Sequence, residues 1–148
     1  MFRSVLVVCV GNICRSPVGE RLLRARMPEL SVGSAGLAAL EGHPADAIST
    51  AVAEAHGVAM AGHVARQFTP DLGMAAEVIL AMEPGHKHEI ARIAPHLAGR
   101  TLLYDQWTGA SGIADPYQRP KEFHEAVFDR LAAAADAWAQ RLGSKDNR

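Results

Sequence analysis

A cysteine, an arginine and a serine lie close together near the start of the chain, in the segment Cys9-Val10-Gly11-Asn12-Ile13-Cys14-Arg15-Ser16. Gly11 and Asn12 tolerate positive φ, so the backbone can curl until successive N–H groups converge on one point and form an anion nest. Arg15 could clamp an oxyanion there with two parallel hydrogen bonds, while Cys9 lies beneath it, positioned to attack. The segment therefore predicts an oxyanion site with a cysteine nucleophile.

The elements on either side of this segment favour that chemistry. Residues 4–10 form an almost continuous apolar, β-branched run, which is typical of a strand buried on both faces of a parallel sheet. After the loop, Ser16 is predicted to cap a helix that has Pro17 at its first position and is limited by Pro28. The positive end of that helix and a hydrogen bond from Ser16 would stabilise the Cys9 thiolate. The alternative is an inert, buried cysteine that ends a strand.

The rest of the chain alternates predicted strands and helices. Strands are predicted over residues 32–35, 78–82 and 101–104, and helices from Asp46 to a stop at Gly57, over residues 84–94 and over residues 120–142. This pattern predicts an α/β fold, a three-layer sandwich with a central parallel sheet of about four strands and helices on both faces. Ligands bind such sheets at the carboxyl ends of the strands, where the Cys9 segment lies. We expect residues 1–148 to form a single domain, with residues 143–148 frayed.

Residues 105–120 are predicted to form one long loop. The segment contains three glycines or serines that favour turns and two prolines, and it follows neither the helical nor the strand period. Loops longer than about 12–15 residues are usually functional or disordered in a compact domain. This loop is therefore a candidate second contributor to the site.

The charge balance and the hydropathy exclude several classes of partner. The chain has 15 Lys and Arg residues against 16 Asp and Glu, a net charge of −1, so no global field favours nucleic acid, and no nucleic-acid binding is expected. The apolar run at residues 5–10 is shorter than the about 7–15 residues of a signal-peptide core. No run approaches the roughly 18 apolar residues of a membrane span. We therefore expect a cytoplasmic protein without membrane insertion.

Neither the cysteines nor the histidines indicate a metal site. Cys9 and Cys14 have no second pair to complete a zinc site, and this cysteine usage suits a reducing cytosol. His86 and His88 lack the i, i+4 spacing of helical metal ligands, and no cysteine or paired carboxylate completes a set. We predict that both histidines are surface side chains and that the protein uses no metal.

The segment Val8-Cys9-Val10-Gly11-Asn12-Ile13-Cys14-Arg15-Ser16-Pro17 resembles the phosphate-binding loop of the low-molecular-weight protein tyrosine phosphatases. The similarity continues, in the family's order and spacing, through Ser34-Ala35-Gly36, Gly62-His63-Val64-Ala65-Arg66-Gln67, Val78-Ile79-Leu80-Ala81-Met82-Glu83 and Asp115-Pro116-Tyr117. Within the family the chain looks most like the bacterial enzymes associated with exopolysaccharide or capsule production, which act on autophosphorylated tyrosine kinases. The resemblance implies hydrolysis of a phosphotyrosine protein through a phosphocysteine intermediate, without a cofactor.

The resemblance also assigns roles to particular residues. Asp115 would be the acid that protonates the leaving phenolate and then the base that activates water. Tyr117 would lie at the rim of the site, beside an apolar wall that includes Leu40. Ser34 and His63 would hold the phosphate loop through hydrogen bonds. The phosphate would be bound by Val10, Gly11, Asn12, Ile13, Cys14, Arg15 and Ser16, and Cys14 would pair with Cys9 under oxidation, which prevents over-oxidation.

Three alternative functions are weighed against this one. An arsenate reductase of the same fold would relay its chemistry to two further cysteines, and none follows Cys14. A protein-arginine phosphatase would be expected to have threonine in place of Ile13. A non-catalytic phosphotyrosine-binding module would not need Cys9, Arg15 and Asp115 intact, and a turnover assay separates it from an enzyme.

Overall fold

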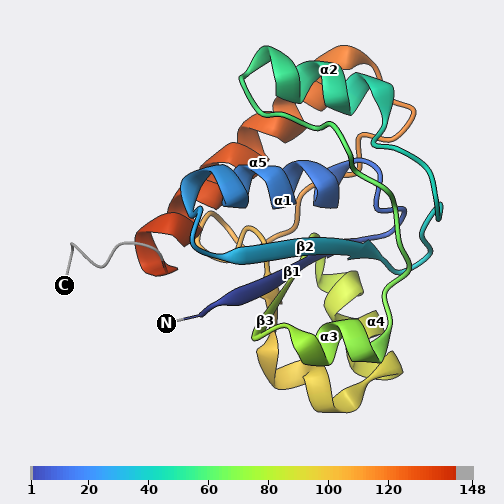
Figure 1. The fold of residues 1–148 in the computed structure, drawn as a ribbon, viewed down its shortest axis with the longest axis vertical. Coiled ribbons are helices and arrows are strands. Elements are labelled where there is room, and N and C mark those ends of the chain that lie inside the picture. The colour runs from blue at the N-terminus through green and yellow to red at the C-terminus, as the bar shows by residue number, and fades with distance from the viewer. Residues whose placement is uncertain (1, 143–148) are drawn as a thin grey trace.

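The computed structural model describes residues 2–142, so the prediction for residues 143–148 lies outside the described residues. Strands and helices alternate along most of the chain (Figure 1). The elements are β1 (Ser4–Cys9), α1 (Arg15–Arg26), β2 (Ser31–Gly36), α2 (Ala47–Ala55), α3 (Pro70–Ala75), β3 (Val78–Ala81), α4 (Pro84–Ile93), a 3-10 helix (Pro95–Arg100), β4 (Thr101–Leu103) and α5 (Lys121–Leu142).

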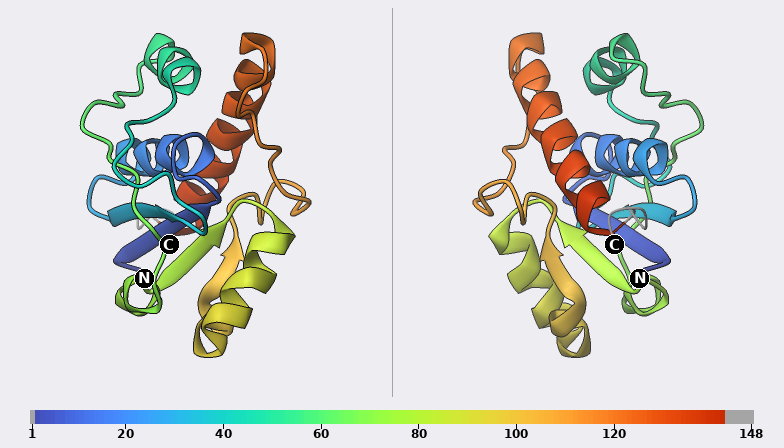
Figure 2. Two further views of the ribbon diagram at one scale, coloured as in Figure 1. Left: turned by 90° about the vertical axis from the view of Figure 1, so that its right-hand side faces the viewer. Right: turned by 90° about the vertical axis from the view of Figure 1, so that its left-hand side faces the viewer.

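The four strands form one parallel sheet in the order β2-β1-β3-β4. In its register, Val7 of β1 lies between Ser34 of β2 and Leu80 of β3. Figures 1 and 2 show the sheet between two groups of helices, with α1, α2 and α5 on one face and α3 and α4 on the other. The predicted α/β sandwich with helices on both faces is confirmed.

Strand β1 is apolar throughout because it contributes to two cores. Val5, Val7 and Cys9 belong to the core beneath α1 and α5, whereas Leu6 and Val8 belong to the core that α3, α4 and the 3-10 helix cover. Successive side chains of a strand point to opposite faces, so a strand covered on both faces needs an unbroken apolar run. This geometry directs Cys9 toward the α1 side of the sheet.

The helix boundaries confirm one predicted cap and correct another. Asp46 caps α2, since its carboxylate accepts hydrogen bonds from Ile48 N at 3.1 Å and Ser49 N at 3.0 Å. Helix α1 begins at Arg15, with Cys14 at the cap position and no side-chain cap bond. The prediction that Ser16 caps α1 was therefore wrong. Its hydroxyl lies inside the first turn and is engaged in the site described below.

Two short elements were not anticipated from periodicity. Helix α3 has six residues, capped by Thr69 with Pro70 at its start, and the 3-10 helix also has six residues. Segments of this length complete too few turns to show a 3.6-residue period. As predicted, no helix or strand forms over residues 105–120, a segment hereafter called the acid loop.

Candidate active site

The carboxyl ends of the strands meet at one edge of the sheet, where the phosphate loop, residues 9–16, begins. Cys9 ends β1, and its side chain is buried. Its Sγ lies 2.9 Å from Ser16 Oγ, as the sequence predicted. Asn12 has a φ of 59°, the positive φ expected for the curl, whereas the φ of Gly11 is not positive. A Cβ at Gly36, the last residue of β2, would lie 2.4 Å from the carbonyl oxygen of Val10, so glycine there lets β2 approach the loop.

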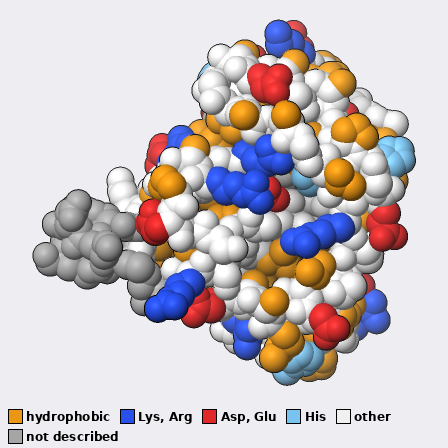
Figure 3. All heavy atoms as spheres, viewed as in Figure 1, with side chains coloured by type: hydrophobic (Ala, Val, Ile, Leu, Met, Phe, Trp, Pro, Cys, Tyr) orange, Lys and Arg blue, Asp and Glu red, His pale blue; other side chains and the backbone are white. Residues whose placement is uncertain are grey.

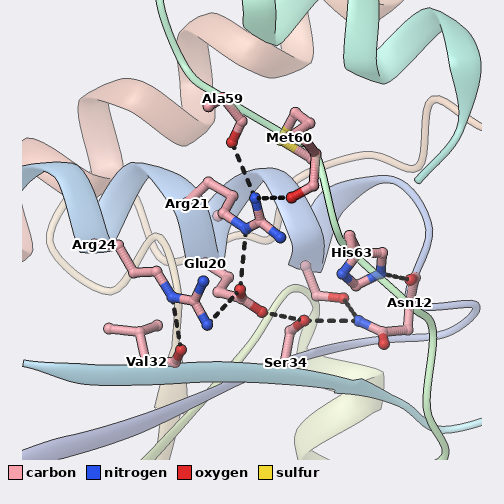
Figure 4. Close-up of polar contacts among 12 residues, drawn as sticks. Asn12, Glu20, Arg21, Arg24, Val32, Ser34, Ala59, Met60 and His63 are labelled. Carbon is pink, nitrogen blue, oxygen red and sulfur yellow. Dashed lines mark hydrogen bonds and ion pairs between the residues drawn. The ribbon is translucent and has the colours of Figure 1, made fainter. Parts of the chain in front are cut away.

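Asn12 fixes the loop from its buried side. Its Nδ2 donates to Ser16 Oγ at 2.8 Å and to Ser34 Oγ at 3.0 Å, and its Oδ1 accepts from Arg66 N at 2.9 Å. Its carbonyl oxygen lies 2.7 Å from His63 Nε2 (Figure 4). The structure therefore places Ser34 and His63 where hydrogen bonds can hold the loop.

The polar chain continues beyond Ser34 to residues that sequence reasoning missed. Ser34 Oγ donates to Glu20 Oε1 at 2.6 Å. The Glu20 carboxylate is buried and pairs with Arg24 Nη2 at 2.9 Å and Arg21 Nε at 3.2 Å (Figure 4). Lys and Arg side chains gather over α1 and β2 on this face (Figure 3). The i, i+4 spacing of Glu20 and Arg24 is the one feature of the sequence that could have predicted their ion pair.

Arg15 brings the acid loop to the phosphate loop. Its side chain is 2% exposed, although it begins α1. Nη1 donates to the carbonyl oxygen of Ile113 at 2.7 Å and pairs with the Glu83 carboxylate, and Nη2 lies 3.7 Å from Asp115 Oδ2. Arg15 and Asp115 are far apart in the sequence, so sequence patterns could not predict this contact. The same holds for the ion pair between Arg15 and Glu83. A guanidinium fixed on several sides is pre-organised to receive an oxyanion.

A cavity of about 210 Å³ opens above Cys9. Leu40 and Tyr117 lie on its lining and are 38% and 42% exposed, which places both at the rim. Asn12 and Ser16 belong to the loop, but their side chains are fully buried and turned to the network beneath it. The whole lining consists of Cys9, Val10, Gly11, Ile13, Cys14, Arg15, Ala38, Leu40, Asp115 and Tyr117.

Cys14 is the second cysteine that lines the cavity. Burial raises the pKa of its thiol and a hydrogen bond with Ser49 lowers it, while the nearby Asp46, Cys9 and Asp115 add to the increase, and together these effects bring the pKa to about 12. Cys14 is therefore a neutral thiol at pH 7. Both cysteines are free, and the disulfide between them stays a prediction.

His86 is buried, so its prediction as a surface side chain was wrong, whereas His88 is exposed as predicted. His86 lies on the inner face of α4, its Nε2 3.9 Å from Glu83 Oε2, and its Nδ1 is buried without a hydrogen-bond partner among residues 2–142. Burial lowers the pKa of His86 below its ordinary value of 6.5, and Arg15 lowers it further, against Glu83 and Asp115.

This pKa shift predicts a pH-dependent stability. Below about pH 6.5 the unfolded chain takes up the His86 proton before the folded chain does, so the free energy of unfolding falls as the pH decreases toward the folded-state pKa. We expect His86→Gln to lose less stability than the wild type between pH 7.5 and 5.5, measured by urea unfolding. The exposed neighbour His88→Gln is the control and should follow the wild type. Equal losses in all three proteins would contradict the assignment.

The fold and the site define a parallel α/β protein with a buried cysteine and arginine on a loop at the carboxyl edge of its sheet. The family model described as low molecular weight phosphotyrosine protein phosphatase matches residues 4–148. The chain belongs to this family, which confirms the resemblance of the phosphate loop. Within residues 2–142, no helix is long and apolar enough to cross a membrane, and no three His, Cys, Asp or Glu side chains group as metal ligands would.

The similar proteins are bacterial phosphatases. The low molecular weight protein-tyrosine-phosphatase Etp of Escherichia coli K12 is 47% identical over 95% of each chain. The crystal structure of the Erwinia amylovora tyrosine phosphatase AmsI is 45% identical with a TM-score of 0.94, over 97% of this chain and 95% of that one. Vibrio vulnificus Wzb, solved in complex with benzylphosphonate, is 43% identical with a TM-score of 0.94, over 96% of this chain and 100% of that one.

Proposed function

We propose that this phosphatase hydrolyses phosphotyrosine in two displacements at Cys9. In the first, the Cys9 thiolate attacks phosphorus and the bond from phosphorus to the phenolic oxygen breaks, while Asp115 gives that oxygen a proton. In the second, water attacks the phosphocysteine, Asp115 takes the proton from the water, and the bond from phosphorus to sulfur breaks. Phosphate leaves and the thiolate is restored. The meeting of Cys9, Arg15 and Asp115 in one cavity carries this proposal.

Arg15 and the phosphate loop would stabilise both transition states. Charge spreads over the equatorial oxygens of the transferred phosphoryl group, and fixed donors act on it most strongly where water is excluded. The loop N–H groups and the first turn of α1 supply positive potential at the same point. The Ser16 hydroxyl, 2.9 Å from Cys9 Sγ, can donate to the thiolate as it leaves.

The form of the cavity favours an aryl phosphate. Leu40, Tyr117 and Val10 are partly exposed apolar side chains at its mouth, and Ile13 adds an apolar side chain to its lining. An aromatic ring can pack between such groups while its phosphate reaches Cys9. Benzylphosphonate, the molecule bound to the Vibrio relative, has this same combination of ring and phosphorus oxyanion.

We further propose an autophosphorylated bacterial tyrosine kinase as the phosphotyrosine protein, with the reaction taking place in the cytoplasm. The support is the resemblance to exopolysaccharide-associated and capsule-associated phosphatases, together with identities of 47% to Etp and 45% to AmsI.

The proposal is tested with one peptide carrying phosphotyrosine, phosphoserine or phosphoarginine at the same position, with a chelator present. We expect phosphotyrosine to be hydrolysed with a kcat/KM roughly 100-fold or more above the other two. Phosphoserine is too short to reach Cys9 from the rim, and the stem of phosphoarginine lacks an aromatic ring to pack between Leu40 and Tyr117. Phosphate release measures each rate. Faster hydrolysis of phosphoarginine would favour an arginine phosphatase, and binding without turnover would favour a recognition module.

A further inference from the structure

Asp105 is a buried carboxylate that the two displacements do not use. It follows β4 at the start of the acid loop, and its side chain is 1% exposed. Its Oδ2 accepts a hydrogen bond from Gly112 N at 3.0 Å and lies 3.4 Å from Arg130 Nη2. Its Oδ1 is buried without a partner among the described residues. Burying a carboxylate costs free energy that an apolar side chain would not, so this placement calls for a role that requires the charge.

The bonds of Asp105 close the first half of the acid loop. Its carbonyl oxygen accepts from Thr108 N at 3.0 Å and Ala110 N at 2.9 Å, while its carboxylate binds Gly112. Gly112 takes φ of +100°, and a Cβ there would lie 3.2 Å from Pro84 Cδ at the start of α4. The carboxylate therefore fixes the loop where its backbone passes tightly over α4, and Arg130 connects the same point to α5.

The segment just after Gly112 reaches the reacting groups. Ile113 N donates to the carbonyl oxygen of Met82 at 2.9 Å, and Ile113 O accepts from Arg15 Nη1 at 2.7 Å. Asp115 follows two residues later, with Oδ2 3.7 Å from Arg15 Nη2. A shift of the backbone at Gly112 is thus transmitted over a very short stretch of chain to Asp115.

We propose that Asp105, paired with Arg130, is a positioning residue that holds the acid loop so that Asp115 reaches the leaving oxygen of the substrate. The inference rests on the acid role proposed for Asp115. Asp105 itself lies away from the cavity lining and touches no reacting atom. Its influence on the reaction passes through the Gly112 hydrogen bond and the loop that follows.

This role has a signature that a general loss of stability lacks. Proton donation matters most when the leaving oxygen is strongly basic, as in phenyl phosphate, and matters little for p-nitrophenyl phosphate. A misplaced acid therefore slows phenyl phosphate selectively. Partial unfolding would instead lower the rates with both substrates by the same factor.

The experiment compares kcat/KM for these two substrates in Asp105→Ala and Asp105→Asn, because kcat/KM reports the first displacement and not the hydrolysis of the phosphocysteine that both substrates share. We expect Asp105→Ala to lower kcat/KM roughly 10-fold or more with phenyl phosphate and by less than about 3-fold with p-nitrophenyl phosphate. Asp105→Asn keeps an acceptor for Gly112 N but loses the charge that pairs with Arg130, so it should lie between. Gln106→Ala is the matched control, because its Oε1 bonds back to Leu103 N and not to Gly112, and it should keep the wild-type ratio.

Asp115→Asn and the double variant Asp105→Ala/Asp115→Asn complete the test. If Asp105 acts through Asp115, adding Asp105→Ala to Asp115→Asn leaves the ratio of the rates with phenyl phosphate and p-nitrophenyl phosphate unchanged. If Asp115→Asn slows both substrates by the same factor, the acid assignment itself is overturned. If Asp115→Asn slows phenyl phosphate selectively but Asp105→Ala slows both substrates equally, or neither, only the positioning role is overturned. Thermal unfolding verifies folding, and Asp105→Asn decides the matter if Asp105→Ala does not fold.

Discussion

Cys9→Ser is expected to abolish turnover while oxyanion binding persists. A serine hydroxyl is far less ionised than a thiol near neutral pH, so the first displacement should slow by about 10⁴-fold or more. Arg15 and the backbone N–H groups of the loop are unchanged, so calorimetry should still detect phosphate binding. The measurement is single-turnover hydrolysis of p-nitrophenyl phosphate, with thermal unfolding as the check on folding.

Cys14→Ser provides the comparison, because Cys14 lines the same cavity but its pKa is raised to about 12 by burial. We expect Cys14→Ser to retain measurable turnover. We also expect iodoacetate to abolish that turnover by alkylating Cys9. Loss of turnover in Cys14→Ser, with turnover retained in Cys9→Ser, would assign the nucleophile to Cys14 instead.

Arg15→Lys is expected to have the second largest effect, a fall of roughly 10²–10³-fold in kcat/KM. The Arg15 guanidinium is planar and is fixed by Ile113 O, Glu83 and Asp115 at once. Lysine keeps the charge but presents a single rotating ammonium, which cannot hold two equatorial oxygens in parallel.

Steady-state kinetics with a phosphotyrosine peptide measures this loss. Arg92→Lys is the matched control, since Arg92 is an exposed arginine of α4 that pairs with Glu89. Exposed ion pairs of this kind contribute little to the free energy of unfolding. It should match the wild type. Wild-type activity in Arg15→Lys would show that charge alone is sufficient and would remove the bidentate clamp from the mechanism.

The segments that were predicted well are those whose structure is set by near neighbours along the chain. The apolar run of β1, the tolerance of Asn12 for positive φ and the cap at Asp46 each depend on a few consecutive residues. Hence the strand, the curled loop and the following helix were all predictable. The first turn of α1 shows the limit, because Ser16 suits a cap by type, yet its hydroxyl bonds Cys9 and Asn12.

His86 and Asp105 were not predictable as buried groups. The burial of His86 arises because α4 faces the Arg15 guanidinium, and that of Asp105 because Arg130 of α5 lies against it. A hydropathy pattern averages over neighbouring residues, so a single polar side chain turned inward leaves no periodic signal. Glu20 was missed for the same reason.

The sequence by itself identified Cys9 as the candidate nucleophile and predicted its loop and the sheet edge at which both lie, because β1, the loop and α1 are contiguous. Residue patterns alone did not connect Asp115 to Arg15. The family resemblance assigned Asp115 to the site, and only the tertiary structure showed Arg15 Nη2 3.7 Å from Asp115 Oδ2. The parallel order β2-β1-β3-β4 brings the carboxyl ends of β1, β3 and β4 to one edge. Contacts between residues so distant along the chain depend on sheet order and helix packing, which local propensities do not encode.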